Sequence, residues 1–426
     1  MLPDCGATLE FRLRGFFITT NEHKAHGLEG SLEAPDWPRL TLAEVDALLR
    51  RYPLAEGAEG LVSHSPRPFS AASLVATPQG NVFVKRHHRS VRDREGLLEE
   101  HRLIGYLRDR CRDLIAPVLA DGDGETAVEV DDWTYEVHAP ARGLDVYEQA
   151  LSWTPFLSCG HAGAAGRALG KLHRAAEGYD ASPRKTRQLV TSFTIFAGNG
   201  AESDNSSDYV CRNPYQRMET YLESRPLLRA YAEKRDWRAS FDELLMPLYE
   251  KLEPWLEYLR PLWTQNDFHA SNLMWSDAGE DAEVTGVVDF GLADRTNAVH
   301  DLATAIERNI IEWLRMDEPQ VDLLHLDHLD AMLTGYGEIR PLSSEEAWAL
   351  VAMLPLVHCE FALSETDYFL SVLHMEERAY LAYEGYFLAH ATWFSGSQGH
   401  RPLEHLERWA DGLAQRTGNG GQQRCL

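Results

Sequence analysis

Three oxygen-bearing side chains in the second half of the chain have types and spacing that suit phosphoryl transfer. Asp267 and Asn272 lie in the segment QNDFHASNLMW, and Asp289 follows in the segment VVDFGLAD. Transfer of a phosphoryl group to a hydroxyl needs a carboxylate that orients the hydroxyl and accepts its proton, and it needs oxygen ligands for Mg²⁺. The pattern therefore predicts Asp267 as the catalytic base and Asn272 with Asp289 as magnesium ligands.

The residues between Asn272 and Asp289 favour a β-hairpin that would bring these side chains together. Apolar and β-branched residues fill 273–275 and 284–288, and the intervening segment 277–281 is polar and contains glycine, as a turn requires. A short loop followed by a hairpin that ends in an aspartate would deliver all three side chains to one point.

These two segments resemble those of the protein-kinase-like superfamily, and within it the aminoglycoside phosphotransferase and choline kinase branch. Protein kinases combine H-R-D-x-x-x-x-N with D-F-G. This chain has D-x-x-x-x-N from Asp267 and D-F-G from Asp289, with Gln265 where the family usually has histidine. Four residues match the combined pattern of the branch: Asn266, Asp267, His269 and Asn272. The resemblance implies a two-lobed α+β kinase fold, with a small β-rich N-lobe and a larger, mostly helical C-lobe, that uses ATP and Mg²⁺.

Two further residues take roles from this resemblance. His269 follows the predicted base by two positions and either contacts the γ-phosphate or is structural. Asp301 lies 12 residues after Asp289, where small-molecule kinases of this family have a buried aspartate that supports the catalytic loop. Its alternative role is a helix N-cap. Protein kinases have a long activation segment and an A-P-E motif after D-F-G, and the absence of A-P-E here favours a small-molecule acceptor.

The first part of the chain contains residues that could hold the phosphates of ATP. Lys85 ends the β-type segment 81–85, and Glu100 lies in the helical pattern of 94–110. In kinases a strand lysine grips the α- and β-phosphates and a helix glutamate pairs with that lysine. The resemblance assigns these roles to Lys85 and Glu100, with Glu99 as the alternative partner.

The remaining nucleotide contacts have no sharp motif. The segment 63–73 stands where the phosphate-covering loop belongs but lacks its glycine signature, so Ser70 and Ser73 are the residues expected to contact phosphate. The resemblance also places the segment YEVH at the connection between the lobes. We therefore expect the backbone at Glu136 and His138 to hydrogen-bond adenine.

The charge balance restricts the partners. The chain has 426 residues and a formal net charge of −25, and its 44% apolar and 25% charged residues are typical of globular proteins. Such acidity excludes nucleic acid as the main partner, because phosphate binding needs a basic surface. The segment 85–94 is locally basic and either focuses a positive field on the phosphates or is a solvated turn. The acidic excess elsewhere predicts a small-molecule hydroxyl acceptor that is neutral or cationic.

The sequence also predicts a cytoplasmic protein with no membrane partner. No apolar run approaches the roughly 18 residues of a transmembrane helix, and charged residues interrupt the start, MLPDCGATLEFRLRGFF, where a signal peptide would be apolar. The six cysteines are scattered without a C-x-x-C pair, which indicates reduced thiols. The oligomeric state stays open.

The elements that must position these residues divide the chain into four parts. We expect a leader at 1–39, a nucleotide-binding N-lobe at 40–138, a catalytic and acceptor-binding C-lobe at 139–415 and a flexible tail at 416–426. The periodicity predicts N-lobe helices at 42–51 and 94–110 and strands at 60–63, 73–77, 81–85, 127–130 and 133–137. It predicts C-lobe helices at 163–176 and 215–224, a β-rich island at 272–290 and a flexible loop or lid at 198–207.

The acceptor-binding residues are the least defined. The acidic, aromatic stretches 360–368 and 376–384 either contact the acceptor or are ordinary amphipathic helices. Residues 322–333 favour an amphipathic helix over a metal site, although His325 and His328 lie one turn apart. We expect an ATP- and Mg²⁺-dependent kinase for a hydroxyl of an aminoglycoside-like compound, amino alcohol, sugar or amino acid. The alternatives are a protein Ser/Thr kinase and a non-catalytic, pseudokinase-type nucleotide-binding module.

Overall fold

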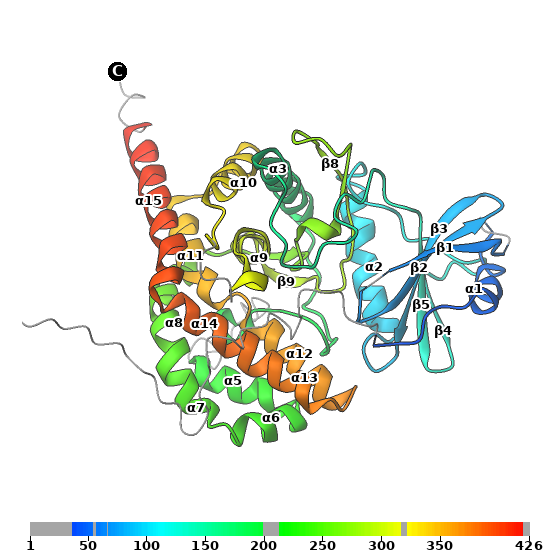
Figure 1. Ribbon diagram of the computed structural model, residues 1–426, viewed down its shortest axis with the longest axis horizontal. Helices are drawn as coiled ribbons and strands as arrows, with labels where there is room; N and C mark the ends of the chain where they lie inside the picture. Colours follow the sequence, from blue (N-terminus) through cyan, green and yellow to red (C-terminus); the bar gives the residue numbers. More distant parts are fainter. Residues whose placement is uncertain (1–35, 54–56, 66, 199–212, 317–321, 421–426) are drawn as a thin grey trace, which may run out of the picture.

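The chain folds into two lobes of unequal size (Figure 1). The computed structural model describes residues 36–53, 57–65, 67–198, 213–316 and 322–420. One β-sheet forms the basis of the smaller lobe and the larger lobe is mostly helical, so the predicted α+β, protein-kinase-like fold is confirmed. Most of the expected leader, and the expected loop after residue 198, lie outside the described residues.

A five-stranded antiparallel sheet forms the N-lobe, with the strand order β1-β2-β3-β5-β4. Gly80, at φ +117°, makes the tight turn between the second and third strands, a conformation that disfavours any residue with a β-carbon. The third strand continues past its predicted end because His87 and His88 pair with Thr134 and Trp133 of the fifth. The five strands are β1 (Gly60–His64), β2 (Ala71–Thr77), β3 (Gly80–His88), β4 (Ala127–Val130) and β5 (Trp133–His138).

Two helices flank this sheet. α1 (Leu42–Leu49) begins at the predicted capping box, in which Thr41 and Glu44 satisfy each other's backbone amides. α2 (Arg94–Arg108) lies between the sheet and the C-lobe (Figure 1). Its apolar face, including Leu103, belongs to the core of the C-lobe. The position of α2 therefore couples the sheet to the C-lobe.

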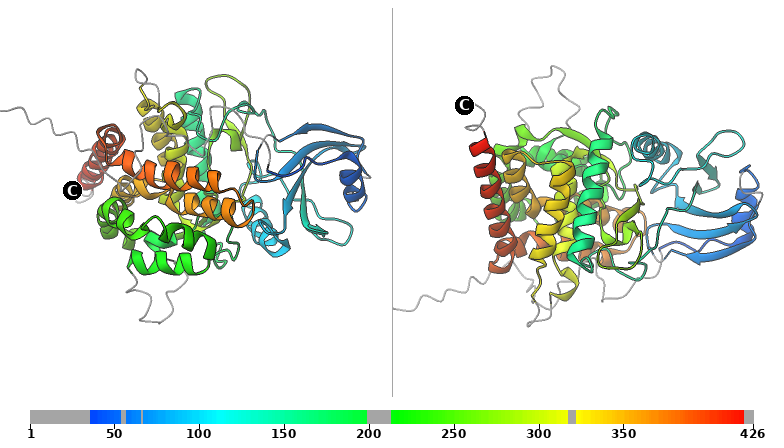
Figure 2. Two further views of the ribbon diagram at one scale, coloured as in Figure 1. Left: turned by 60° about the horizontal axis from the view of Figure 1, so that its bottom comes forward. Right: turned by 90° about the horizontal axis from the view of Figure 1, so that it is seen from above.

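The C-lobe is built around two helices that lie side by side, α3 (Cys159–Ala176) and α10 (Leu326–Ile339) (Figure 2). They approach closely because each presents glycine to the other: a β-carbon at Gly166 would lie 2.1 Å from the backbone oxygen of Met332. α9 (Ala298–Ile310) is buried along its whole length. The other helical segments are α4 (Thr194–Ala197), α5 (Pro214–Glu223), α6 (Pro226–Glu233), α7 (Trp237–Ser240), η2 (Phe241–Leu245), α8 (Met246–Leu252), η3 (Glu253–Tyr258), η4 (Ala270–Asn272), η5 (Trp313–Arg315), α11 (Ser344–Met353), η6 (Leu354–Leu356), α12 (Cys359–Ser371), α13 (Glu376–Tyr380), η7 (Leu381–Leu388), α14 (Ala389–Phe394) and α15 (Ser397–Gly420).

Two small sheets hold the loop that carries Asp267. β6 (Pro261–Thr264) pairs with β9 (Asp294–Asn297), and β7 (Leu273–Trp275) pairs with β8 (Val284–Val287). The predicted hairpin is the β7–β8 pair. β6 and β9 were not predicted, because both strands are short and lack an alternating pattern. Their pairing depends on partners far apart in the chain, which local reading does not detect.

Several helix boundaries differ from the prediction, and α3 begins at Cys159 and not at 163. α10 begins at Leu326 and not at 322, because Leu324 forms a β-bridge with Ile311. α15 continues to Gly420, into the segment 416–426 that was expected to be a flexible tail.

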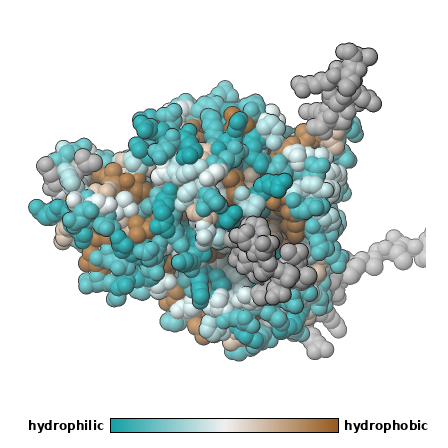
Figure 3. Space-filling model, turned by 180° about the vertical axis from the view of Figure 1, so that it is seen from behind, coloured by the Kyte–Doolittle hydropathy of each residue, from teal (hydrophilic) through white to brown (hydrophobic). Residues whose placement is uncertain are grey.

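One long apolar helical stretch lies inside the C-lobe. Among the described residues, Ser344–Ser371 has the length and composition to cross a membrane, but 89% of its most apolar window is buried in the protein. It packs there as part of the core. The face opposite to that of Figure 1 is mostly hydrophilic, with scattered apolar patches (Figure 3).

Candidate active site

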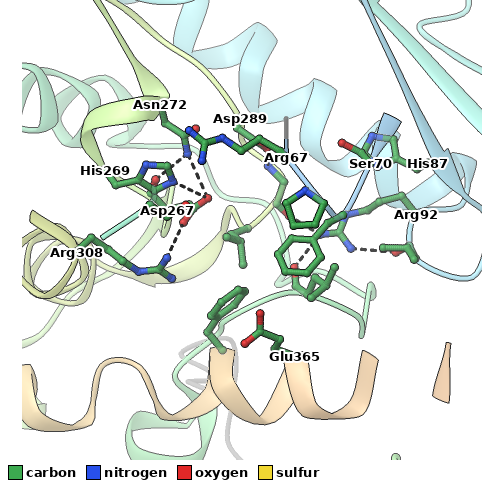
Figure 4. Close-up of a pocket in the computed structure, with 18 of the residues that line it drawn as sticks. Arg67, Ser70, His87, Arg92, Asp267, His269, Asn272, Asp289, Arg308 and Glu365 are labelled. Carbon is green, nitrogen blue, oxygen red and sulfur yellow. Dashed lines mark hydrogen bonds and ion pairs between the residues drawn. The ribbon is translucent and has the colours of Figure 1, made fainter. Parts of the chain in front are cut away.

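A cleft between the lobes collects most of the residues marked by the sequence (Figure 4). Its lining includes Ser70 and Lys85 from the N-lobe and Asp267, Asn272 and Asp289 from the C-lobe. The three oxygen-bearing side chains therefore face one cavity, together with the lysine expected to bind phosphate.

Asp267 lies in the loop between β6 and η4. Asn272 Nδ2 donates to Asp267 Oδ2 at 3.2 Å and to its backbone oxygen at 3.0 Å. Arg308 Nη1 lies 3.5 Å from Oδ1, and His269 Nε2 lies 3.5 Å from Oδ2 (Figure 4). Both carboxylate oxygens are thus held in position by neighbouring side chains.

These neighbours also set the ionisation of Asp267. Burial would raise the pKa of this carboxyl, but the interactions with His269, Arg308 and Asn272 outweigh burial and lower the pKa to about 2. Asp267 is therefore ionised at neutral pH and can accept a hydrogen bond from a hydroxyl in the cleft.

Asp289 follows β8 in the left-handed conformation, with φ +56°. Its Oδ1 accepts hydrogen bonds from Lys85 Nζ at 3.0 Å and from the amide of Gly291 at 3.2 Å. Burial, the largest single effect, raises the pKa of Asp289, but the charge and hydrogen bond of Lys85 together with the hydrogen bond from the Gly291 amide leave the net pKa below the ordinary value. Because Asn272 turns its Nδ2 toward Asp267, its Oδ1 is the atom that could bind a cation. A carboxylate and an amide oxygen suit Mg²⁺.

Gln265, which stands in place of the family's histidine, connects the two halves of the site. Its Oε1 accepts from the amide of Asp267 at 2.9 Å. Its Nε2 donates to the backbone oxygens of Val288 at 3.2 Å and Asp289 at 2.7 Å. One amide side chain thereby fixes the loop of Asp267 against the D-F-G segment.

Asp301 supports the loop that carries Asp267 through hydrogen bonds to its backbone. Its two carboxylate oxygens accept the amides of Gln265 at 3.0 Å and Asn266 at 2.9 Å. His173 Nε2, from α3, lies 3.1 Å from Oδ2. The N-cap of α9 is Asn297, so the alternative N-cap role does not apply to Asp301. The contacts are those expected of a buried support for the catalytic loop.

His269 lies next to the predicted base and lines the cleft. Its Nδ1 hydrogen-bonds Ser271 Oγ at 2.9 Å, while its Nε2 faces Asp267. Burial lowers the pKa of His269, and the charge of Asp267 only partly offsets this effect, so the neutral imidazole is favoured. This position is compatible with both expected roles, phosphate contact and structural support.

The predicted hydrogen bond between Lys85 and Glu100 is not formed. Lys85 donates to Asp289 instead, and Glu100 Oε2 lies 3.6 Å from Arg184 Nη2. The reason is that Arg184 inserts beside α2 from the C-lobe and also lies 3.8 Å from Glu99. Burial lowers the pKa of Lys85, but the charges of Asp289, Glu136 and Glu100 outweigh it and raise the pKa.

The two predicted phosphate-loop serines separate in the structure. Ser70 lines the cleft, whereas Ser73 lies within β2 and is fully buried. The Ser73 hydroxyl hydrogen-bonds His64 Nδ1 at 2.8 Å. The expectation that Ser73 contacts phosphate was wrong, because β2 begins at Ala71 and carries this residue into the sheet.

The expected adenine contacts at Glu136 and His138 are also wrong. Both residues belong to β5, which runs between β3 and the segment that contains β4. Glu136 is opposite Lys85 on one side and Ala127 on the other, and His138 is opposite Phe83 and Val118. Their backbone is therefore enclosed by the sheet, and the connection between the lobes begins only after His138.

Two arginines in the cleft were missed. Arg67, in the loop between β1 and β2, donates to the backbone oxygen of Ala150 in the C-lobe at 3.1 Å. Arg308, on α9, is 3% exposed and stacks over Trp153 at 4.4 Å from the ring centroid. The available signal was the adjacent charged pair Glu307 and Arg308 within the predicted helical run that contains Ile306 and Ile310, since buried charges seldom occur without a specific partner.

The two acidic stretches expected near the acceptor have divided roles. In the first, Glu360 is buried and accepts hydrogen bonds from the backbone of Ser192 and Ile195, whereas Glu365 lines the cleft. In the second, Arg378 lines the cleft and Glu384 pairs with Arg235. Each stretch therefore contributes one charged residue to the cavity wall.

Comparison with known proteins agrees with this architecture. A sequence model of the phosphotransferase enzyme family matches residues 69–342. No curated protein sequence matches the chain. The structure of a microcompartment-associated aminopropanol kinase is similar, with a TM-score of 0.53 and 17% identity over 85% of this chain and 99% of that chain. This similarity shows a shared fold.

Two further solved structures show weaker similarity. An aminoglycoside phosphotransferase from Alicyclobacillus acidocaldarius has a TM-score of 0.43 and 13% identity, covering 90% of this chain and 98% of that chain. A spectinomycin phosphotransferase, in complex with ADP and spectinomycin, has a TM-score of 0.46 and 12% identity, covering 83% of this chain and 98% of that chain.

Proposed function

The chain belongs to the phosphotransferase enzyme family and is a small-molecule kinase, and we propose that it transfers the γ-phosphoryl group of ATP to a hydroxyl with Asp267 as the base. The observation that carries the proposal is the common cleft of Asp267, Asn272, Asp289 and Lys85. A base, two oxygen ligands and a phosphate-binding cation are the parts that phosphoryl transfer requires.

Asp267 orients the acceptor in this mechanism. Its carboxylate is ionised at neutral pH and is fixed by Asn272 and Arg308, so it accepts the hydrogen bond of the incoming hydroxyl and then its proton. Arg308 keeps the carboxylate charged while the acceptor binds. The oxygen of the acceptor is thereby directed toward the γ-phosphorus.

Asn272 and Asp289 would hold Mg²⁺ through Oδ1 and the carboxylate. When bound there, Mg²⁺ would supply positive charge to offset the negative charge of the phosphates. Lys85 now donates to Asp289, and we propose that it turns to the α- and β-phosphates when nucleotide enters. Ser70 and Arg67 also line the cleft, and both would contact the phosphates from the N-lobe.

The acceptor pocket is proposed on the C-lobe side of Asp267. Its wall combines Glu365 and Arg378 with the aromatic rings of Trp153, Phe361 and Phe369. The whole cleft has five basic side chains, Arg67, Lys85, Arg92, Arg308 and Arg378, and three acidic ones, Asp267, Asp289 and Glu365. The cleft therefore has more basic than acidic side chains, unlike the whole chain with its net charge of −25. A cleft of this kind does not favour a cationic acceptor. Of the two expected classes, neutral and cationic, we propose an acceptor without net charge, such as a hydroxylated zwitterion or polyol.

The proposed location remains the cytoplasm. Among the described residues, Cys111, Cys159 and Cys359 have free thiols, which suits a reducing compartment.

The substitution Asp267→Asn tests the assignment of the base. We expect transfer to a hydroxyl acceptor, measured as ADP release with a panel of zwitterionic, cationic and anionic hydroxyl compounds, to fall by about 10²- to 10⁴-fold. Binding of Mg²⁺ and a non-hydrolysable ATP analogue should persist. Asp277→Asn, in the exposed hairpin turn, is the control and should leave turnover unchanged. Full activity of Asp267→Asn would exclude this residue as the base.

A further inference from the structure

Three histidine side chains converge on one buried carboxylate in the N-lobe, behind the phosphate-binding lysine. Glu136 of β5 is 1% exposed. Its Oε2 lies 2.9 Å from His101 Nε2 and 2.8 Å from His138 Nε2, and its Oε1 lies 2.9 Å from His87 Nε2. The four side chains come from α2, β3 and β5, so they join the helix to the sheet.

Three of these side chains have ligand atoms spaced as in a metal site, and His87 faces the other oxygen of the same carboxylate. Each imidazole presents its Nε2 to the same carboxylate, and the ring planes of His101 and His138 are nearly perpendicular, at 84°. The ligand atoms of His101, Glu136 and His138 all lie within 4.8 Å of one another. Imidazole nitrogen and carboxylate oxygen are the ligands that Zn²⁺ and similar divalent ions take.

We propose that His101, Glu136 and His138 bind one Zn²⁺ ion, with His87 as the fourth ligand. Tetrahedral zinc with bonds of about 2.0–2.1 Å separates its ligand atoms by about 3.3 Å. The observed separations of 2.8 and 2.9 Å between nitrogen and oxygen need to open by only about 0.5 Å.

The surroundings of His101 support this assignment. Its second ring nitrogen, Nδ1, hydrogen-bonds Thr126 Oγ1 at 2.9 Å. Histidines that bind metals generally use the other ring nitrogen in such a bond, which fixes the tautomer and the ring orientation. A hydroxyl both donates and accepts, so Thr126 can accept from Nδ1–H when Nε2 binds the metal.

The site lies beside the phosphate-binding lysine. Glu136, which carries the carboxylate charge, is directly opposite Lys85 in the β3–β5 register. An ion held by α2 and β5 would neutralise that charge and fix the helix against the sheet. This inference does not depend on the identity of the acceptor or on the proposed base.

Zinc binding to the full-length protein tests the site. The protein is stripped with a chelator and titrated with Zn²⁺ by calorimetry in excess Mg²⁺, so that the cleft between the lobes does not compete. We expect His138→Gln, whose wild-type side chain is 19% exposed, to lose one bound Zn²⁺ or to bind it more than about 100-fold more weakly. His405→Gln, on α15, is the control and should bind as the wild type does.

Two further measurements test the site if His138→Gln does not fold. Thr126→Val keeps all four ligands and should weaken Zn²⁺ binding by about 10-fold. Co²⁺ in the wild-type site should give the visible absorption of a four-coordinate ion, and His138→Gln should not. Equal uptake of Zn²⁺ by the wild type and His138→Gln, or no uptake by either, would overturn the proposal and leave a hydrogen-bonded cluster.

Discussion

Lys85 Nζ donates a hydrogen bond to Asp289 Oδ1 over 3.0 Å, which joins strand β3 of the N-lobe directly to the D-F-G segment of the C-lobe. The proposed phosphate-binding cation thus pairs with the proposed metal ligand. In the proposed mechanism, Mg²⁺ and phosphate would replace this pair together, so nucleotide binding would be coupled to the relative position of the lobes.

Replacing Lys85 with methionine should weaken the binding of Mg²⁺-nucleotide. A hydrogen bond to a charged group contributes about 1.5–3 kcal/mol, which corresponds to roughly 10- to 100-fold in the dissociation constant. Calorimetry with a non-hydrolysable ATP analogue measures the change. Lys171→Met, in α3 outside the cleft, is the matched control. If Lys85→Met bound the nucleotide analogue with unchanged affinity, the assignment of Lys85 as the phosphate-binding residue would be contradicted.

Arg67→Gln tests a residue that only the structure identified. Arg67 reaches into the cleft from the loop over the phosphate site, and the charges of Asp267 and Asp289 act on it. We expect kcat/KM for nucleotide to fall by about 10- to 100-fold, as for other charge-assisted contacts. The exposed Arg112→Gln should have no such effect in the same steady-state assay. If Arg67→Gln had a normal kcat/KM, Arg67 would have no role in nucleotide binding, and its only role would be to join the lobes through its bond to Ala150.

The sequence predicted those parts of the site that lie close together along the chain. Asp267, Asn272 and Asp289 lie within 23 residues of one another, and a hairpin between them is a local structure. Periodicity also located the sheet and α2, because alternation and amphipathic spacing are local signals. The role of Asp301 came from the family resemblance, and the structure shows its bonds to the loop backbone.

The contacts that the sequence missed or misplaced join distant segments. Arg184 approaches Glu100 from 84 residues away and occupies the place where Lys85 was expected. Glu136 and His138 were assigned to the lobe connection by the family resemblance, although the predicted strand 133–137 already included Glu136, and pairing with β3 continues to His138. Arg308 lies on a buried helix, and only the tertiary fold brings it to Asp267.

Glu307 should make the stability of the protein depend on pH. Burial raises the pKa of Glu307 to about 7, although Arg308 lowers it in part. The folded state therefore binds more protons than the unfolded state between about pH 4.5 and 7. The contribution of Glu307 to the free energy of unfolding must fall as pH rises through this window and stay constant above it.

Glu307→Gln removes this titration. Between pH 4.5 and 8, the wild type should lose up to about 3 kcal/mol of unfolding free energy relative to Glu307→Gln, from the 1.36 kcal/mol per pKa unit of linkage. Urea unfolding of both proteins at the two pH values measures the difference. The exposed Glu257→Gln should show no pH-dependent difference from the wild type. If Glu307→Gln also showed no pH-dependent difference from the wild type, the raised pKa of Glu307 would be contradicted.

Gly335 connects the packing of the C-lobe to the catalytic loop. A β-carbon at Gly335 would lie 2.1 Å from the backbone oxygen of Gly163, so an alanine there must push α10 away from α3. Next to it, Tyr336 OH hydrogen-bonds His173 Nδ1 at 2.7 Å, and His173 Nε2 bonds Asp301. Separation of the two helices should therefore disturb the support of the loop that carries Asp267.

Gly335→Ala should destabilise the protein by about 1–3 kcal/mol or more, as overpacking of a core does, and should also lower kcat. Gly337→Ala, on the same helix, is the matched control: its β-carbon would meet nothing within 4 Å, and alanine should stabilise the helix by about 0.5–1 kcal/mol. Urea unfolding and steady-state kinetics of both variants measure the two effects. If Gly335→Ala destabilised the protein without lowering kcat, the chain of contacts from Tyr336 through His173 to Asp301 would hold the C-lobe together without positioning the base.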